Sequence, residues 1–553
     1  DGDTAARYDW DQAGIDGLRC DFGQGLPPRA WEYMINVARS HKWNFVMMSE
    51  SLDGGAVTYR SNRHFDILNE NIVFPLKSAT TKFDYRNIFE GRRAAYGQGL
   101  VLINNTSHDE ENYADPWEAL VRFSVACTLD GVPMIFPGQE LGISTTTGYD
   151  HYELNFGKEI PHFKRFNSMM PIWNDTDFGN DQLYPVYAGM GAARQFSPAL
   201  RSSNRWFLDG DGNNARIHAV AKYETANASA ATSDVVLAFA NLDRDNTQSD
   251  NFKIPPALAD LLGLKDDRLY NVRNIAAYTA QDSTRRDTWQ WGNGISGADL
   301  KANGFFVSMN PVPTTVQGWT DAPFEAQYLK VYDVTPPPAP PAPGNANTFQ
   351  SQPLGYALGT DVTFAWSASA ANTADDVVTG YRLTIEDSQG ATVFDQDVGN
   401  VLEYTYSGSV GETYTATVRA VSAAGIEGAA SPTSATVAML NVTADDDGDG
   451  QSNGDEDTAR TNPLDPTSAF RISTAQTQDD GQGGRQVTLS WDSAPGVSYV
   501  IESMAPFQAP LNWTTEPTGT SILGDGSTLS WTDPGTLSAN PGETKAYRVT
   551  TSP

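Results

Sequence analysis

Three short apolar runs near the start of the chain end in side chains that can do chemistry. "GIDGLRCD" ends in Arg19 and Asp21, "FVMMSE" ends in Glu50, and "LVLINNTSHDE" leads to His108 and Asp109. Cleavage of a glycosidic bond with retention needs two carboxyl groups, a nucleophile and an acid that later acts as a base. A third carboxylate would stabilise the positive charge that develops on the sugar. These residue types predict a glycosidase if the fold brings the ends of the three runs together.

The elements that must position these side chains alternate between strands and helices. Strands are expected over residues 15–20, 45–48, 65–68, 100–104 and 132–136, with helical stretches such as "PRAWEYMINVARSH" between them. This alternation predicts a parallel sheet with right-handed crossovers. In a barrel of such strands, Arg19 and Asp21 would share the face at the mouth, where Arg19 would keep Asp21 ionised. Leu18 and Cys20 would point the other way, under the helices.

A family resemblance rests on these runs and on a fourth. "GIDGLRCD", "FVMMSE", "NNTSHDE" and "GVPMIFPGQELGI" resemble, in this order, four signatures of the α-amylase family of retaining α-glucan-active enzymes. The resemblance covers roughly residues 10–330. It implies a multidomain fold: a partial (β/α)8 TIM barrel, strands 4–8, over residues 1–195, followed by all-β sandwich domains. The first of these is a C domain over residues 196–334.

The same resemblance implies roles for individual residues. Asp21 would be the nucleophile, Glu50 the general acid/base and Asp109 the stabiliser of the transition state. Arg19 and His108 would bind the substrate, with Arg19 also holding Asp21. The implied reaction is double displacement on α-glucans such as starch, glycogen or maltooligosaccharides.

Two other functions stay open. Many family members carry a Lys-His pair after the nucleophile, where this chain has Gln24 and Gly25, so an α-glucan transglycosylase is one alternative. A non-catalytic, secreted glycan-binding or adhesion protein is the alternative from another class. Because the sequence begins just before strand 4 of the implied barrel, an N-terminal fragment of the same precursor that carries strands 1–3 is an expected partner.

The remainder of the chain is rich in β patterns. "TPPPAPPAPG" predicts a proline-rich linker over residues 335–346. Residues 347–440 alternate as in a seven-strand, fibronectin-type-III-like sandwich, and residues 468–553 predict a further β module. The tryptophans of these modules are expected in their cores. Sugar stacking and packing are both open for four aromatic residues nearer the start: Tyr113, Trp117, Tyr149 and Tyr152.

A second chemical motif, "DDDGDGQSNGDE", lies in residues 441–467. It fits the calcium-loop pattern D-x-[DN]-x-[DN]-G-x5-E, in which alternate carboxylates turn inward on one ion. The predicted Ca²⁺ ligands are Asp445, Asp447, Asp449, Gln451 through its carbonyl, and Glu456. With the following "TNPLDPTS", the segment resembles the thrombospondin-type-3 and dockerin-like calcium repeats of secreted proteins. A single copy suggests a rigid joint between domains.

Composition narrows the class of protein. The 553 residues carry a net charge of −31, which disfavours nucleic acid and anionic membranes as partners. No run of apolar residues is long enough to predict a membrane span. The two cysteines, Cys20 and Cys127, do not form a disulfide framework, and Cys20 is expected to be a small buried residue. Together with the calcium motif, this composition predicts a secreted, periplasmic or cell-surface protein.

Overall fold

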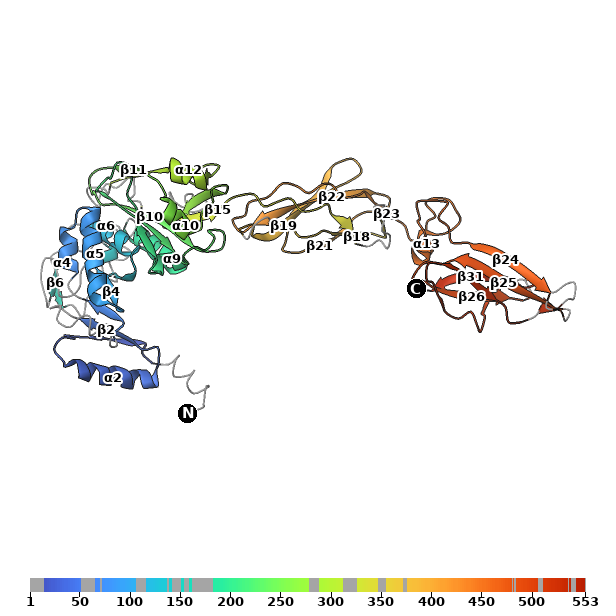
Figure 1. The fold of residues 1–553 in the computed structure, drawn as a ribbon, viewed down its shortest axis with the longest axis horizontal. Helices are drawn as coiled ribbons and strands as arrows, with labels where there is room; N and C mark the ends of the chain where they lie inside the picture. The colour runs from blue at the N-terminus through green and yellow to red at the C-terminus, as the bar shows by residue number, and fades with distance from the viewer. Residues whose placement is uncertain are drawn as a thin grey trace. The chain divides into compact units, whose positions relative to one another are not determined.

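The computed structural model divides the chain into two compact units, Asp1–Thr335 and Pro336–Pro553 (Figure 1). It describes residues 14–50, 65–69, 72–105, 116–136, 139–141, 151–153, 159–161, 183–277, 288–311, 326–346, 355–370, 375–479, 481, 484–505, 511–535, 537–538 and 544–552. Within these ranges, no helix has both the length and the apolar character needed to cross a bilayer.

The first unit begins with a parallel sheet whose five strands follow one another in chain order. They are β1 (Gly17–Cys20), β2 (Val46–Glu50), β3 (Ile67–Asn69), β4 (Leu100–Asn104) and β5 (Gly131–Met134). All four pairings are parallel, as the strand–helix alternation predicts. The connecting helices include α2 (Pro28–His41), α4 (Val73–Ser78), α5 (Lys82–Tyr96) and α6 (Pro116–Ala126). The carboxyl ends of the strands therefore meet along one edge of the sheet.

The strand register defines the two faces of this sheet. Arg19 pairs with Met48 and Cys20 pairs with Ser49, so Arg19 and Glu50 lie on one face while Cys20 and Ser49 lie on the other. Cys20 is buried, as predicted. Leu18 shares the face of Cys20, as predicted, but it is 49% exposed, so the prediction that it lies under the helices is wrong. Its strand, β1, is at the edge of the described sheet.

An antiparallel sheet follows two helices, α8 (Tyr184–Phe196) and α9 (Pro198–Arg201). Its strands lie in the order β13-β12-β15-β10-β9-β8. Their bounds are β8 (Arg205–Phe207), β9 (Ile217–Tyr223), β10 (Val235–Asn241), β12 (Leu269–Asn274), β13 (Ile295–Ser296) and β15 (Gln327–Asp333). A separate pair, β11 (Gln248–Phe252) and β14 (Phe305–Met309), lies with the short helices α10 (Pro256–Leu262) and α12 (Gly297–Ala302).

The parallel and antiparallel sheets share one hydrophobic core. Val220, Val236 and Tyr328 of the antiparallel sheet belong to the same buried cluster as Leu120 of α6 and Met190 of α8. The opposite face of the antiparallel sheet builds a second core against β11 and β14, in which the rings of Phe239, Phe252 and Phe305 contact one another. The first unit is therefore held together by helices that are buried between two sheets.

Arg194 of α8 ties this shared core to the backbone. Its guanidinium donates hydrogen bonds to the carbonyls of Cys127, Leu129, Gly131 and Leu200, at 2.7–3.0 Å. The loop between α6 and β5 thereby gains side-chain donors for the carbonyls of Cys127 and Leu129.

The second unit contains two β-sandwiches. The first pairs a three-stranded sheet, β16-β18-β21, with a five-stranded sheet, β17-β23-β22-β19-β20. The strands are β16 (Gly344–Asn345), β17 (Gly355–Leu358), β18 (Asp361–Ala365), β19 (Val378–Glu386), β20 (Thr392–Gly399), β21 (Glu403–Ser407), β22 (Thr413–Ser422) and β23 (Val437–Leu440). Trp366 is 6% exposed and packs on Tyr381, as expected of a core tryptophan.

A short helix, α13 (Asn453–Ala459), separates this sandwich in the chain from the second one. One sheet of the second sandwich has the order β24-β25-β29, with β30 beside β25, and the other has β27-β26-β28, with β31 beside β26. The strands are β24 (Ile472–Asp479), β25 (Gly484–Asp492), β26 (Ser498–Met504), β27 (Thr514–Thr515), β28 (Ile522–Leu523), β29 (Thr528–Thr532), β30 (Leu537–Ser538) and β31 (Ala546–Ser552). Trp491 and Trp531 are buried in its core, as predicted.

Candidate functional site

Arg19 joins two of the predicted catalytic carboxylates at the edge where β1 and β2 end. One guanidinium nitrogen contacts Asp21 Oδ1 and the other contacts Glu50 Oε1. The sequence predicts the first contact and misses the second, which depends on the register of β1 against β2. Because both carboxylates bind a single guanidinium, Asp21 and Glu50 face the same small region of space.

The two carboxylates differ strongly in solvent access. The side chain of Asp21 is 77% exposed, whereas that of Glu50 is 7% exposed. An exposed carboxylate beside a sheltered one suits a nucleophile that meets the substrate and an acid/base group shielded from bulk water. Asp21 is therefore open to an incoming molecule, whereas Glu50 is largely shielded from water.

The turn after β1 holds Asp21 against β2. Phe22 has a φ of 47°, in the left-handed region, and its amide donates a hydrogen bond of 3.0 Å to Glu50 Oε2. The amide of Gly23 donates to the carbonyl of Glu50 at 2.7 Å, and a Cβ on Gly23 would lie 2.0 Å from Ser49 Oγ. Trp31 of α2 donates from its indole to the carbonyl of Gly23 at 2.8 Å. Only a glycine fits at this close approach, so the turn fixes the spacing of Asp21 and Glu50.

Asn69 is a candidate site residue that the sequence analysis missed. It ends β3 and pairs in register with Glu50, so its side chain lies on the face that carries Arg19 and Glu50. It is 8% exposed, and its Oδ1 is buried without a hydrogen-bond partner in the described part of the chain. The signal available in sequence was a polar residue at the end of the strand "FDILN".

The other predicted residues near this edge fall into two groups. His108, Asp109, Tyr113 and Tyr149 lie outside the described residues, as does the side chain of Tyr152 in β6 (His151–Glu153). Trp117 is 1% exposed and belongs to the shared core, so the reading of Trp117 as a sugar platform is wrong. It is buried because α6 is enclosed by the two sheets.

The predicted calcium ligands come together in the second unit. Carboxylate oxygens of Asp445, Asp447 and Asp449 lie within 4.8 Å of one another. Gly448 and Gly450 have positive φ and donate their amides to the two oxygens of Asp445, at 2.8 and 2.9 Å. The loop thus turns tightly and directs three negative charges at one point.

Glu456 of α13 adds a fourth carboxylate to this cluster. It is fully buried, and its Oε2 has no hydrogen-bond partner among the described residues, like Oδ2 of Asp447 and of Asp449. Burial, then the charges of Asp447 and Asp449, raise the pKa of Glu456 to about 7. Free carboxylate oxygens converging from a loop and a helix form the donor set that Ca²⁺ prefers, so these residues fit that ion.

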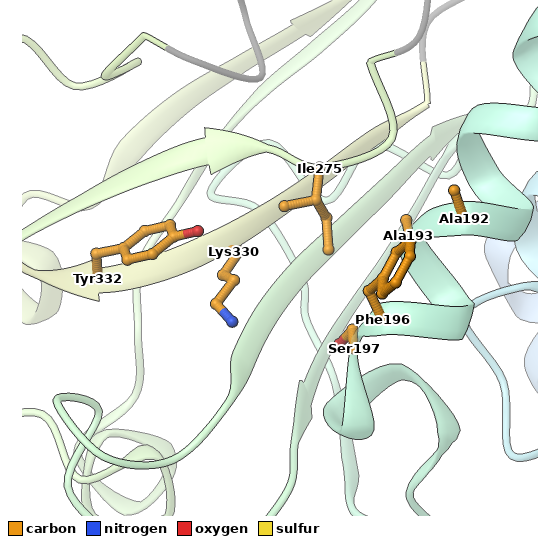
Figure 2. A pocket seen from close by; sticks show the side chains of 7 residues that line it. All are labelled: Ala192, Ala193, Phe196, Ser197, Ile275, Lys330 and Tyr332. Atoms are coloured by element: carbon orange, nitrogen blue, oxygen red, sulfur yellow. The ribbon is translucent and has the colours of Figure 1, made fainter. Parts of the chain in front are cut away.

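A pocket in the first unit lies apart from the predicted site residues. It has a cavity volume of about 260 Å³, and Figure 2 shows Phe196, Ile275, Lys330 and Tyr332 around it. Its polar groups already serve the fold, because Lys330 and Ser197 both bind Asp234, at 2.9 and 2.5 Å.

Comparison with known proteins gives likenesses of structure. No protein-family model matches the sequence, and no curated protein matches it. Among solved structures, an Anoxybacillus α-amylase is similar at a TM-score of 0.39 with 13% identity, over 60% of this chain and 62% of that enzyme. The acarbose-bound α-amylase of Geobacillus thermoleovorans gives a TM-score of 0.38 and 12% identity, over 60% of this chain and 63% of that enzyme.

A maltogenic α-amylase of Thermotoga neapolitana gives a TM-score of 0.35 and 14% identity, over 59% of this chain and 63% of that enzyme. This chain therefore spans less than two thirds of the length of each of the three enzymes. The function proposed for it rests on its own residues.

Proposed function

We propose that the first unit carries part of the active site of a retaining glycoside hydrolase that acts on α-glucans, with the five-stranded sheet as part of a (β/α)8 barrel. The observation that supports this most is the contact of Arg19 with both Asp21 and Glu50 at the ends of adjacent parallel strands. Two carboxyl groups close enough to flank one anomeric carbon are the requirement for retention. The four motifs that resemble the α-amylase family supply the substrate class.

In the proposed reaction, Asp21 attacks the anomeric carbon while Glu50 gives its proton to the departing glycosidic oxygen. Glu50 then takes a proton from water while the water oxygen attacks the anomeric carbon. The bond between the sugar and Asp21 breaks, and the second inversion gives net retention. Glu50 must hold a proton before the first step, so Arg19 has to shift from Glu50 toward Asp21 when substrate binds. Asp109 and His108 keep their proposed roles as transition-state stabiliser and sugar ligand.

The apolar side chains beside the site suggest a protein partner. Val46 and Leu100 lie on the face of Arg19 and are 41% and 42% exposed. We propose that further strand–helix units, supplied by an N-terminal fragment of the same precursor, cover this face. We also propose that the protein acts outside the cytoplasm, where α-glucan is its substrate and Ca²⁺ is available to the acidic loop.

A trapping experiment tests the proposed nucleophile. The full chain would be incubated with a 5-fluoro-α-glucosyl fluoride, whose glycosyl–enzyme forms faster than it breaks down, and then analysed by intact mass and peptide mapping. The expected result is one added sugar on Asp21, absent in Asp21→Asn. A label on another residue, or none in the presence of a co-expressed N-terminal fragment, would contradict the proposal.

Product analysis with maltooligosaccharides separates the two catalytic alternatives, since products longer than the substrate mean transfer to an acceptor sugar. A non-catalytic glycan-binding protein would bind glucan and show neither labelling nor products.

For the second unit, we propose that the acidic loop binds one Ca²⁺ through Asp445, Asp447, Asp449, the carbonyl of Gln451 and Glu456. The buried, unpartnered oxygens of Asp447, Asp449 and Glu456 support this proposal. We further propose that the first sandwich is a fibronectin-type-III-like module.

A further inference from the structure

The acidic loop and α13 contact both sandwiches of the second unit. On one side, Tyr356 of β17 donates its hydroxyl hydrogen to Asp457 Oδ1 of α13 at 2.8 Å. On the other side, the Gln451 amide donates to the carbonyl of Phe470 at 2.8 Å and its oxygen accepts from the Phe470 amide at 3.3 Å. The ring of Phe470 stacks on Tyr499 in the core of the second sandwich, with centroids 5.4 Å apart. One predicted ligand, Gln451, and the neighbour of another, Asp457, thus each contact one of the two modules.

The start of α13 is also bound to the chain that leaves the first sandwich. Asn453 is fully buried and donates to the carbonyl of Asn441 at 2.8 Å and to Asp446 at 2.7 Å. The amide of Gly454 donates to the carbonyl of Val442 at 2.9 Å, and a Cβ on Gly454 would lie 2.7 Å from Val442. The helix therefore packs directly on the connection between the two modules.

Without a bound cation, the carboxylates of the acidic loop and α13 repel one another. Carboxylate oxygens of the three loop aspartates lie within 4.8 Å of one another, near enough to Glu456 of α13 for their charges to act on it, and like charges in such a cluster repel. Repulsion between the loop and the helix favours their separation, which would break the Tyr356 and Gln451 contacts together. A bound divalent cation reverses the sign of the interaction between loop and helix.

We propose that occupancy of the acidic loop by a divalent cation locks the joint between the two sandwiches, with Tyr356–Asp457 and Gln451–Phe470 as the two connections that it fixes. The proposal rests on the cation site proposed above and goes beyond it, because a loop can bind a cation without stiffening its neighbours. Tyr356 is 5% exposed, and burial followed by its bond to Asp457 raises its pKa, so its hydroxyl remains a donor.

The test measures the joint and the cation separately on the full chain. Spin labels are attached at Val393→Cys and Leu523→Cys, which are exposed and lie in different sandwiches, and report the distribution of distances between the modules. Both native cysteines are buried, so they should not take up the label. Calorimetric titration with CaCl₂ after chelator treatment reports binding. We expect Ca²⁺ to narrow the distance distribution about twofold and to slow proteolysis between residues 441 and 471 about tenfold.

Two variants distinguish the possible failures. Asp449→Asn should lose both Ca²⁺ binding and the narrowing. Tyr356→Phe should still bind Ca²⁺, with a several-fold weaker affinity because site and joint are coupled, and should lose most of the narrowing. The matched control Tyr404→Phe, in the same sandwich, should behave as wild type in both measurements.

If wild type binds no Ca²⁺, the proposed cation site is wrong, and so is the proposal that the cation locks the joint. If wild type binds Ca²⁺ but its distance distribution does not narrow, or if Tyr356→Phe narrows as wild type does, the cation site stands and the proposed joint is overturned.

Discussion

At the scale of single residues, the proposed active site depends on one cation shared by two acids. Arg19 contacts both Asp21 and Glu50, although only Asp21 is close to it in sequence. In the proposed reaction, Arg19 can therefore weaken its contact with Glu50 and strengthen its contact with Asp21 when a substrate enters. This gives Arg19 a positioning role that a carboxylate pair without a common cation would lack.

Replacement of Glu50 by glutamine should separate catalysis from binding. The amide cannot give a proton to the leaving oxygen or take one from water, so we expect kcat to fall by about a thousandfold or more. Affinity for glucan, measured by calorimetry, should change little, since glutamine keeps the size of the side chain. Added azide, a nucleophile that needs no base, should restore turnover of an activated glycosyl fluoride; no rescue would count against the role of Glu50.

Gly23 provides a test of the turn that spaces the two acids. A Cβ there would lie 2.0 Å from Ser49 Oγ and 3.0 Å from the Glu50 carbonyl. We expect Gly23→Ala to lower the free energy of unfolding of the first unit by about 2 kcal/mol. Gly91→Ala is the matched control, because nothing lies within 4 Å of the added methyl group and the position is helical. The control should be neutral or more stable by up to about 1 kcal/mol. Equal effects of the two variants in denaturant unfolding would contradict the close packing.

His218 predicts how stability depends on pH. It is fully buried, and burial lowers its pKa from 6.5 to about 3. Between these values the unfolded chain binds a proton that the folded chain does not, so stability falls as the pH drops. This group should cost about 1.4 kcal/mol per pH unit below about pH 6.

His218→Gln should flatten the pH dependence of the unfolding free energy measured between about pH 7 and about pH 5. Nε2 of His218 lies 2.9 Å from Thr128 Oγ1. Because the Thr128 hydroxyl donates to the carbonyl of Val125, it accepts the bond from His218, and the side-chain amide of glutamine can donate the same bond. Identical slopes in the two proteins would show that His218 is not the group responsible.

At the scale of elements, Arg194 makes the end of α6 dependent on α8. Four backbone carbonyls accept from its guanidinium. Arg194→Met keeps most of the apolar stem and removes every donor, so we expect a loss of about 3 kcal/mol in the unfolding free energy of the first unit. Arg201→Met, at an exposed arginine in the next helix, is the control and should cost less than about 1 kcal/mol. Similar losses in both would refute the special role of Arg194.

The parallel sheet was predictable because each of its strands carries a local signal. β4 has the predicted bounds, and β5 and β2 differ by two residues or fewer at each end. The bond between Arg19 and Glu50 was not predictable, because it depends on the register of strands separated by a helix. The burial of Trp117 could not be predicted either, because an aromatic residue at the start of a helix gives the same sequence signal whether one sheet or two sheets cover the helix.

At the scale of the whole molecule, the acidic loop belongs to the second unit alone. Ca²⁺ should therefore raise the unfolding temperature of that unit and leave the first unit unchanged. At a concentration a hundred times the dissociation constant, the gain would be about 2.7 kcal/mol. Differential scanning calorimetry with Ca²⁺ or with a chelator checks this, using Asp449→Asn as control. A shift in the transition of the first unit would contradict it.

The core that runs between the two sheets of the first unit also constrains how the protein can be rearranged. Val220, Val236 and Tyr328 bury their apolar atoms in one core with α6 and α8. A gene fusion that transplanted only the segment after α9 would expose this apolar surface to solvent and promote aggregation. Recombination, in the laboratory or in evolution, should tolerate a crossover beside Thr335 far better than one beside Arg194.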